Sequence, residues 1–484
     1  MAALLVLIPI LALVVLNLPL GKLGSVAALP FAILYCLAEA FASVAMPDAF
    51  WAGAPAPQLA RQLGNALGTF PVDAFVRVMF FCIALVGLCT ALVARYHRSA
   101  EETELRFANL LLLILAGMNG IVLVHDLFAL YVFLEVTSVC SLILIVVEKG
   151  REAFEGAFKY MVLGAVATSL MLAGLALLFT LSGSTSFEVV RASLAGVRAA
   201  PLTLVAVAFF VVGLSIKAGL VPFHGWLPDA YSAAPAPVSV LLAGIVTKTT
   251  GVYTLIRVVH EVLGNEGRIG PMLLAVATAS ILVGALAALG QRDLKRMLAY
   301  SSISQVGYIV LGLAVGTPLA LLGAVLHLLN HAIFKTLLFV NSAAVEKQAG
   351  TRDMNQLGGI SARMPVTGTT SVIALLSTAG IPPFSGFWSK LIIIIGVWKA
   401  GEHGYAAAAV LASVLTLAYF LSMQRRVFFG KLAESCASLK EAGFWALVPA
   451  LLLTALTVGL GVSAPWLLPW VFQAFHVPQI GSIL

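Results

Sequence analysis

The sequence predicts an all-α polytopic membrane protein that crosses the bilayer about fourteen times. Of its 484 residues, 61% are hydrophobic and only 10% are charged, and the mean hydropathy is +1.05. In a soluble domain about a quarter of the residues are charged, so the composition argues against a soluble fold. Apolar runs of about 18 to 25 residues, the length that spans a bilayer, follow one another along the whole chain.

The first apolar run has neither a basic region before it nor a small-residue cleavage site after it, so we expect a retained helix rather than a signal peptide. The prolines at 222 and 382 are expected to break the seventh and twelfth helices. The expected spans are 2–20, 24–46, 72–94, 107–124, 126–147, 157–181, 201–222, 236–260, 271–290, 298–316, 318–343, 366–398, 404–424 and 442–471.

Basic residues gather in alternate connections between these spans. One side holds Lys22, Arg95, Arg98, Arg106, Lys149, Arg151, Arg292, Lys295, Arg296, Lys347, Arg352, Arg363, Arg425, Arg426, Lys431 and Lys440. The other side holds little beyond Arg61, Arg191, Arg198, Arg268 and Lys399. The positive-inside rule therefore predicts a multi-pass protein of a bacterial or archaeal cell membrane with both termini on the non-cytoplasmic side. This bias also explains the net charge of +7, which needs no nucleic-acid partner.

The cysteines and glycines carry no cofactor motif. The five cysteines have no CxxC or Cys/His spacing suited to zinc, haem or an iron–sulfur cluster, and four of them lie inside apolar spans. The 42 glycines are scattered through the expected helices, where they favour close packing, and form no phosphate loop. We therefore expect no metal and no cofactor in this chain.

An internal repeat organises the chain. The segment "AGLVPFHGW" at 218–226 matches "AGIPPFSGF" at 379–387, and "HDLFALYVFLE" at 125–135 falls on "RDLKRMLAYSS" at 292–302. Five spans per copy is an odd number, so the two copies would have opposite topology, as in many transporters. The expected segments are 1–106 with helices 1–3, a first repeat at 107–265, a second, inverted repeat at 266–430, and a C-terminal helix in 431–484.

A row of titratable residues lies inside the apolar spans. A charged side chain at the middle of a membrane helix costs at least about 2.5–3.5 kcal/mol on insertion scales, so each needs a reason. The row predicts a proton or cation relay, with Glu135 as the carboxylate best placed to act on Lys217. Its members are Glu135, Lys217, Lys248, His327, His331, Lys335 and Lys390.

Plainer interpretations stay open for several of these residues. Lys217 could snorkel from a helix end, although about sixteen apolar residues precede it. Glu135 could simply neutralise a lysine in a structural ion pair. A lone histidine is more often a core residue, but His327, His331 and Lys335 have the spacing i, i+4, i+8 of one helix face. His224 and Asp229 lie near a boundary, where interfacial polarity is an equal alternative.

With these residues in view, the sequence resembles the antiporter-like subunits of respiratory complex I, Mrp-type cation/proton antiporters and group 4 membrane-bound hydrogenases. The resemblance covers nearly the whole chain and is strongest between 125 and 395. Its motifs are "HDLFALYVFLE", "KAGLVPFHGWLPDAYSAAPAPVS" (217–239), "RDLKRMLAYSSISQVGY" (292–308), "LHLLNHAIFKTLLF" (326–339) and "AGIPPFSGFWSKL" (379–391). They look most similar to the D-type Mrp subunit and its hydrogenase counterparts.

The resemblance implies roles for matching positions. The family's input pair falls on Glu135 and Lys217, its central lysine on Lys248, its histidine bridge on His327 and His331, and its final group on Lys390. It also implies partners: other membrane subunits of one complex, including at least one further antiporter-like chain, together with membrane lipids. Any oxidoreductase activity would then belong to those partners, because this chain has no redox centre of its own.

We therefore expect an ion-translocating subunit that moves protons, or exchanges them for sodium, along this row of residues. A complex I N- or M-type subunit is an alternative within the same family. Two other classes remain open: a stand-alone transporter of an organic solute, which also uses inverted repeats, and a structural scaffold whose buried charges form inert ion pairs.

Overall fold

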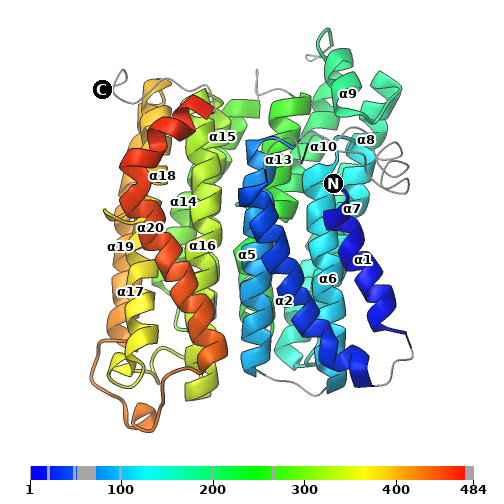
Figure 1. The fold of residues 1–484 in the computed structure, drawn as a ribbon. Helices are drawn as coiled ribbons and strands as arrows, with labels where there is room; N and C mark the ends of the chain where they lie inside the picture. Colours follow the sequence, from blue (N-terminus) through cyan, green and yellow to red (C-terminus); the bar gives the residue numbers. More distant parts are fainter. Residues whose placement is uncertain are drawn as a thin grey trace. The chain divides into compact units, whose positions relative to one another are not determined.

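The computed structural model describes residues 2–18, 22–46, 51, 72–97, 101–197, 200–263 and 269–474. Within these ranges the regular structure is helical, apart from two isolated β-bridges (Figure 1). The connection 47–70, apart from Trp51, and four of the basic residues used to predict orientation, Arg61, Arg98, Arg198 and Arg268, lie outside the described residues.

Most of the helices follow the expected spans, and two short helices, at 187–194 and 226–233, lie between them. From the N-terminus they are α1 (Leu4–Leu16), α2 (Lys22–Ala45), α5 (Ala74–His97), α6 (Glu101–Leu123), α7 (Leu127–Ile145), α8 (Arg151–Ser182), α9 (Phe187–Leu194), α10 (Pro201–Lys217), α11 (Trp226–Ala233), α12 (Ala236–Leu241), the π-helices η1 (Leu242–Val246) and η2 (Lys248–Tyr253), α13 (Thr254–Arg257), the π-helix η3 (Val258–Leu263), α14 (Ile269–Leu289), α15 (Leu294–Val315), α16 (Pro318–Ala349), the 3₁₀ turn η4 (Ile360–Ala362), α17 (Pro365–Ala379), α18 (Ser385–Lys399), α19 (His403–Val427), the 3₁₀ turn η5 (Glu434–Cys436) and α20 (Phe444–Ala474).

Eleven helices within the described ranges are long and apolar enough to cross a bilayer, counting Ala236–Leu263 as one. The helices α1 and α10 are shorter apolar helices at the expected spans 2–20 and 201–222. The expected span 366–398 is divided between α17 and α18. The prediction of an all-helical polytopic membrane protein is confirmed, and the number fourteen stays a prediction.

The chain divides into two compact units. Unit 1 consists of Met1–Gly219 and Ala233–Gly264, and unit 2 consists of Leu220–Ser232 and Asn265–Leu484. In unit 1, α2 packs on α5 and α6, and α8 packs on α7 and α10. Small residues permit the closest of these contacts: a Cβ added at Gly174 of α8 would lie 2.9 Å from the Ala206 carbonyl oxygen of α10.

In unit 2, the long helix α16 packs on α15, α17, α18 and α20, the last drawn in red in Figure 1. A buried apolar cluster joins three of these helices. Leu319 and Leu322 come from α16, Ile392 comes from α18, and Leu468 and Phe472 come from α20. This packing holds α16, the helix that carries three of the predicted relay residues, against α18, which carries a fourth.

Two helices are interrupted where the sequence places prolines. The first ends with α10 at Lys217 and resumes with α11 at Trp226, and the second ends with α17 at Ala379 and resumes with α18 at Ser385. Each break contains a glycine in the left-handed region, Gly219 with φ +69° and Gly380 with φ +82°. Glycine adopts this conformation without steric cost, so the chain can leave the helix there.

The two β-bridges have the same form in the two units. In unit 1 the Leu127 N–H donates to the Thr185 carbonyl (2.8 Å) and the Phe187 N–H donates to the His125 carbonyl (3.0 Å). In unit 2 the Leu294 N–H donates to the Arg352 carbonyl (2.9 Å) and the Met354 N–H donates to the Arg292 carbonyl (2.8 Å). Each of these four residues lies 167 positions after its counterpart. The bridge fixes the start of α7 in one unit and of α15 in the other.

Candidate functional site

The predicted pair of Glu135 and Lys217 meets inside unit 1. Lys217 is the last residue of α10, and its Nζ lies 3.6 Å from Oε1 of Glu135 on α7. The same Nζ donates a 2.9 Å hydrogen bond to Oγ of Ser138, one turn further along α7. Lys217 is only 7% exposed, so it does not snorkel to a surface of the unit. The carboxylate is thus near the ammonium without a direct hydrogen bond to it.

Lys248 lies in a π-helical segment of the same unit. It is 1% exposed, and its Nζ donates to the carbonyl of Ala243, five residues earlier. A π-turn displaces backbone carbonyls from the regular α-helical pattern, and such turns are frequent at functional sites. Among the described residues, no carboxylate pairs with Lys248. Its ammonium is therefore held by backbone alone.

Gly251 brings the two lysine-bearing helices together. A Cβ added at Gly251 on η2 would overlap the backbone of Ala218 and lie 2.8 Å from the carbonyl carbon of Lys217. The absence of a side chain allows η2 to rest directly on the end of α10. Lys248 therefore lies within one helical turn of the contact between Gly251 and the end of α10.

In unit 2, His327 belongs to a hydrogen-bonded group between α16 and α18. Nδ1 of His327 lies 2.9 Å from Oγ of Ser389. The amide of Asn330 donates to the same Oγ (3.0 Å) and to the Ser385 carbonyl (2.9 Å). Nε2 of His327 has no hydrogen-bond partner among the residues that the structure describes. One side of the imidazole is thus fixed while the other is available for a proton or for water.

Lys390 lies beside this group on α18. Its Nζ donates a 2.8 Å hydrogen bond to the Thr378 carbonyl at the end of α17 and lies 4.5 Å from the centre of the Tyr308 ring. The Tyr308 ring also lies 5.9 Å from the ring of His327, between centroids. Lys390 is 3% exposed and has no carboxylate partner within the described part of the chain. Breaking the helix at Gly380 exposes the carbonyl that holds this ammonium.

His331 and Lys335 continue along the same face of α16. The rings of His327 and His331 are parallel, with 6.2 Å between their centroids. Lys335 turns toward α15, where its Nζ donates to the Leu298 carbonyl (3.0 Å) and to Oγ of Ser301. The i, i+4, i+8 spacing therefore does place three titratable side chains on one helix face, as predicted from the sequence. All three are fully buried in the unit.

One buried ion pair was missed by sequence reasoning. Lys295, which the sequence pattern assigns to a basic connection, is 1% exposed, and its Nζ lies 2.9 Å from Oε2 of Glu346. Arg352 lies 2.8 Å from Asp293 and 4.0 Å from Glu346. A count of the basic residues in each connection cannot distinguish a lysine or arginine in a loop from one that lies in a helix with its side chain buried.

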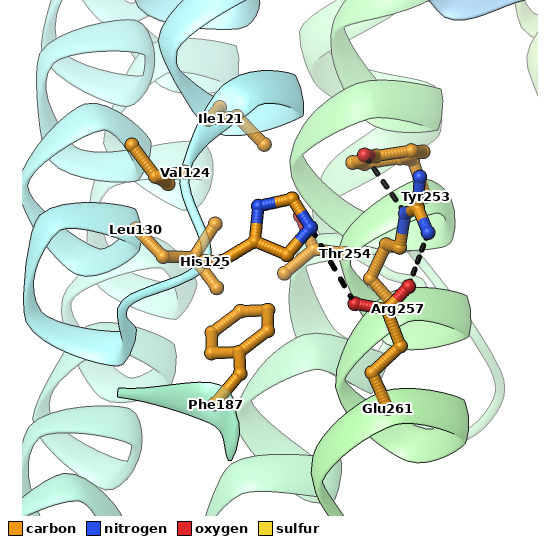
Figure 2. Close-up of a pocket in the computed structure, with 9 residues that line it drawn as sticks. All are labelled: Ile121, Val124, His125, Leu130, Phe187, Tyr253, Thr254, Arg257 and Glu261. Carbon is orange, nitrogen blue, oxygen red and sulfur yellow. Dashed lines mark hydrogen bonds and ion pairs between the residues drawn. The ribbon is translucent and has the colours of Figure 1, made fainter. Parts of the chain in front are cut away.

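A second polar cluster, in unit 1, was also missed. Arg257 pairs with Glu261, lies 2.7 Å from Asp73 at the start of α5, and donates to the Tyr253 hydroxyl (3.0 Å). Figure 2 shows the His125 ring pointing at Glu261, with 3.9 Å between Nε2 and Oε2. A small cavity with room for about one water molecule is lined by His125, Arg257 and Glu261. An arginine one turn before a glutamate at the end of an apolar span is the sequence signal that indicates it.

The predicted residues therefore fall into two groups, each within one unit. In unit 1 Glu135 and Lys217 are in contact, and Lys248 lies on η2, which packs against α10. In unit 2 His327 and Lys390 share the ring of Tyr308 on α15, while Lys335 bonds to Leu298 and Ser301, nearer the start of the same helix. The sites consist of buried cations, one carboxylate and backbone carbonyls, an arrangement suited to holding and passing protons or small cations.

Comparisons with known proteins identify the family of this chain. The family described as NADH:quinone oxidoreductase/Mrp antiporter, TM, matches residues 124–416. The chain is 38% identical over 368 residues to NADH-quinone oxidoreductase subunit N of Desulforudis audaxviator, covering 75% of this chain and 73% of that protein. It is 32% identical over 410 residues to the D subunit of the Na⁺/H⁺ antiporter of Alkalihalophilus pseudofirmus, covering 83% of each.

A solved structure shares the whole fold. A chain of the Mrp complex from Dietzia sp. DQ12-45-1b matches with a TM-score of 0.88 at 27% identity, over 98% of this chain and 96% of that chain. The residues matched by the family include all seven predicted site residues. The resemblance seen in the sequence is thereby confirmed: the chain belongs to the NADH:quinone oxidoreductase/Mrp antiporter transmembrane family and is an antiporter-like subunit of that type.

Proposed function

We propose that this chain moves protons across the membrane, either alone or in exchange for sodium, through its buried titratable residues. The observation that carries the proposal is the contact of Lys217 with Glu135 and Ser138 inside membrane-spanning helices. Two charged groups at this depth cost several kcal/mol, and a stable fold does not require them. A transport step gives them a reason to be there.

The 3.6 Å separation between Lys217 Nζ and Glu135 Oε1 supports a switch between two states. Lys217 is hydrogen-bonded to the Ser138 hydroxyl, and Glu135 Oε1 has no hydrogen-bond partner among the described residues. Rotation of the lysine side chain toward Glu135 would exchange one partner for the other. Because the interaction of two charges in a poorly solvated site depends strongly on their distance, this small movement would change how firmly Lys217 holds its proton.

The proposed relay uses each group in turn. In unit 1 the proton would pass from the Glu135 and Lys217 pair to Lys248, whose ammonium has no carboxylate partner among the described residues. In unit 2 it would use His327, His331 and Lys390, with Lys335 as a further site on the same face of α16. Nε2 of His327 supports this part of the proposal, because within the described ranges it is a buried ring nitrogen without a hydrogen-bond partner.

We also infer that residues 107–265 and 266–430 are two inverted copies of one five-helix repeat. The β-bridges at the starts of α7 and α15 support this because they use the same backbone pairs 167 positions apart. The helices α8 and α16 support it too, since each has 32 residues and each ends at a glycine with positive φ, Gly183 and Gly350. An inverted pair would give one half-channel in each repeat.

We propose that the chain works inside a multi-subunit complex with other membrane subunits, including a second antiporter-like chain. Its relatives are subunits of such complexes by name. Gentle purification of the tagged protein from its native membrane, followed by mass spectrometry, tests this. Hydrophilic redox subunits in the preparation would indicate a redox-driven pump, and small membrane subunits with a second antiporter-like chain would indicate a cation/proton exchanger. Recovery of the chain alone would favour a stand-alone transporter.

Transport is tested with Lys217→Met in the purified complex, reconstituted into proteoliposomes with an entrapped pH-sensitive dye. Methionine keeps the length and apolar stem of lysine but cannot hold a proton, so coupled proton movement should fall to background. Lys440→Met is the matched control, because Lys440 is an exposed lysine between α19 and α20. It should assemble and transport as the wild type does.

The outcomes separate transport from scaffolding. Loss of transport with normal assembly supports the relay. If Lys217→Met leaves both assembly and coupled ion flux unchanged, the relay is refuted and the buried charges are structural. Running the assay with and without a sodium gradient decides whether sodium is exchanged, since only an exchanger acidifies or alkalinises the vesicles when sodium alone is added.

A further inference from the structure

Unit 1 contains a pocket between α1 and α2 that the relay does not use. The pocket has a volume of about 360 Å³, within the range of small-molecule sites. Its walls are apolar and include Ile8 of α1, Phe31 and Leu34 of α2, and Trp51. One carboxylate, Glu39 of α2, lines it as well. The pocket thus combines a large apolar surface with a single acidic group.

Glu39 is buried without a hydrogen bond. It is 1% exposed, and neither of its carboxyl oxygens has a hydrogen-bond partner among the described residues. Within the same ranges it pairs with no lysine, arginine or histidine. Buried carboxyl groups in native proteins are almost always hydrogen-bonded or paired, because an unsatisfied one is costly. The isolation of Glu39 therefore calls for a ligand that the described residues do not supply.

The polar neighbours of Glu39 are Tyr35 and Asn119, and each donates a hydrogen bond to another acceptor. Pro9 has no backbone N–H, so it leaves the Leu5 carbonyl of α1 without its helical hydrogen bond. Tyr35 donates its hydroxyl proton to that carbonyl (2.6 Å), and the Asn119 side-chain amide donates to the same carbonyl (3.3 Å) and to the Tyr35 hydroxyl oxygen (2.9 Å). The Tyr35 hydroxyl and the Asn119 amide are thus bonded to α1 and to each other, and Glu39 is the carboxyl group that lines the pocket.

We propose that this pocket binds an amphiphilic amine, with the amine on Glu39 and the apolar body along α1 and α2. An amine takes the carboxyl proton and returns a charge-assisted hydrogen bond, which is about twice as strong as a neutral one. The aliphatic part would lie against Ile8, Phe31 and Leu34. Since Ile8 is 39% and Leu34 is 64% exposed, the pocket is open along its apolar edge.

The depth of the carboxyl group suits such a ligand. Glu39 lies six residues before Ala45, the last residue of α2, which is about 9 Å along the helix axis. An amphiphile entering from the surrounding membrane can therefore keep its chain among lipid tails while its amine reaches Glu39. A neutral lipid tail would fill the apolar walls equally well but would leave the carboxyl group unpaired. This inference is independent of the proposed ion translocation.

The first experiment measures protection of Glu39 from dicyclohexylcarbodiimide in the purified complex in lipid nanodiscs. This apolar reagent reacts with protonated carboxyl groups: the acid adds across one C=N bond, and the O-acylisourea formed rearranges to a stable N-acylurea, so the whole reagent is retained. Peptide mass spectrometry then locates the modified residue. Dodecylamine should protect Glu39, whereas 1-dodecanol, the neutral match of equal chain length, should not.

The second experiment measures binding of a fluorescent probe, N-dansyl-1,12-diaminododecane, whose free amine is the group tested. Glu39→Gln keeps the shape of the side chain and should weaken binding about tenfold, the loss expected for one charge-assisted hydrogen bond. Ala42→Leu keeps the carboxyl group, fills the pocket and should weaken binding as well. Glu155→Gln is the control, since Glu155 is an exposed glutamate on α8, and it should bind the probe as the wild type does.

Several results would overturn the proposal. Equal protection by the amine and the alcohol would mean that the pocket accepts alkyl chains without using Glu39. Undiminished probe binding in Glu39→Gln, or an unlabelled Glu39 in the wild type together with no probe binding, would also refute it. If Glu39→Gln does not assemble, two measurements still test the proposal. One compares protection by the amine and by the alcohol in the wild type, and the other measures probe binding by Ala42→Leu.

Discussion

The ammonium nitrogen of Lys390 lies 4.5 Å from the centre of the Tyr308 ring, and this ring, carried by α15, also lies beside the His327 imidazole. A cation over an aromatic face in a poorly solvated site gains about 2 kcal/mol. We expect Tyr308→Leu to lower coupled transport about tenfold or more, because it removes that interaction from Lys390. Tyr308→Phe keeps the ring and should retain most transport.

The phenylalanine variant also separates stability from transport. It removes the hydroxyl that donates to the Ala409 carbonyl (2.6 Å), which should cost about 1 kcal/mol of stability. Thermal unfolding of the purified complex measures this loss and the proteoliposome assay measures transport. Equal transport by the two variants would show that the ring itself does nothing for Lys390.

Gly251→Ala should separate the two lysine-bearing helices of unit 1. The added Cβ would overlap the backbone of Ala218, which cannot move aside as a flexible side chain would. We expect a loss of about 1–3 kcal/mol in stability together with reduced transport, since Lys217 shares this contact. Gly164→Ala on α8 is the control, because no atom lies within 4 Å of its added Cβ. Equal stability of Gly251→Ala and Gly164→Ala would contradict the close contact between Gly251 and Ala218.

The buried pair of Lys295 and Glu346 is expected to be structural. Lys295→Met should cost about 2 kcal/mol or more, because it leaves Glu346 with less counter-charge in a partly buried position. The double variant Lys295→Met with Glu346→Gln should recover much of that loss and should still transport. A double-mutant cycle on thermal stability gives the coupling energy. Transport that stays abolished in a stable double variant would instead place the pair in the relay.

Arg257 should stabilise the end of unit 1 where α5 begins. Its guanidinium joins Asp73, Glu261 and the Tyr253 hydroxyl, and it lies over the rings of Phe75 and Tyr253. We expect Arg257→Met to destabilise the protein by about 3 kcal/mol, because two carboxylates then lie together without their cation. Arg257→Lys should restore part of this loss, since a single ammonium cannot reproduce the planar fork. The unfolding temperatures should therefore decrease in the order wild type, Arg257→Lys, Arg257→Met, which thermal unfolding measures.

The orientation predicted from basic residues can be checked with two single cysteines. The five native cysteines are buried, so background labelling should be low. We expect Ala400→Cys, in the connection after α18, to react with a membrane-impermeant maleimide on intact cells. Lys431→Cys, in the connection after α19, should react only after the membrane is opened. The reverse pattern would place both termini on the cytoplasmic side.

Much of the site could be predicted from the sequence because charged residues are rare in membrane helices. Each of the seven predicted residues stood out as a titratable group in an apolar run, and the structure buries six of them almost completely. Glu39 and Arg257 are also charged residues within expected spans, but no function was predicted for them from the sequence. A single acidic or basic residue near a span end does not reveal whether it faces a pocket, a partner side chain or the membrane surface.

The sequence by itself determined the class of the protein, the positions of its helices and the location of their breaks. These follow from local properties: the length of an apolar run, the missing N–H of proline and the conformational freedom of Gly219 and Gly380. The tertiary structure alone decided which polar atoms meet. Lys217 bonds to Ser138, 79 positions away, and Asn119 bonds to the Leu5 carbonyl of α1, 114 positions away. Such contacts depend on the rotation and register of one helix against another, which side-chain packing over the whole unit sets.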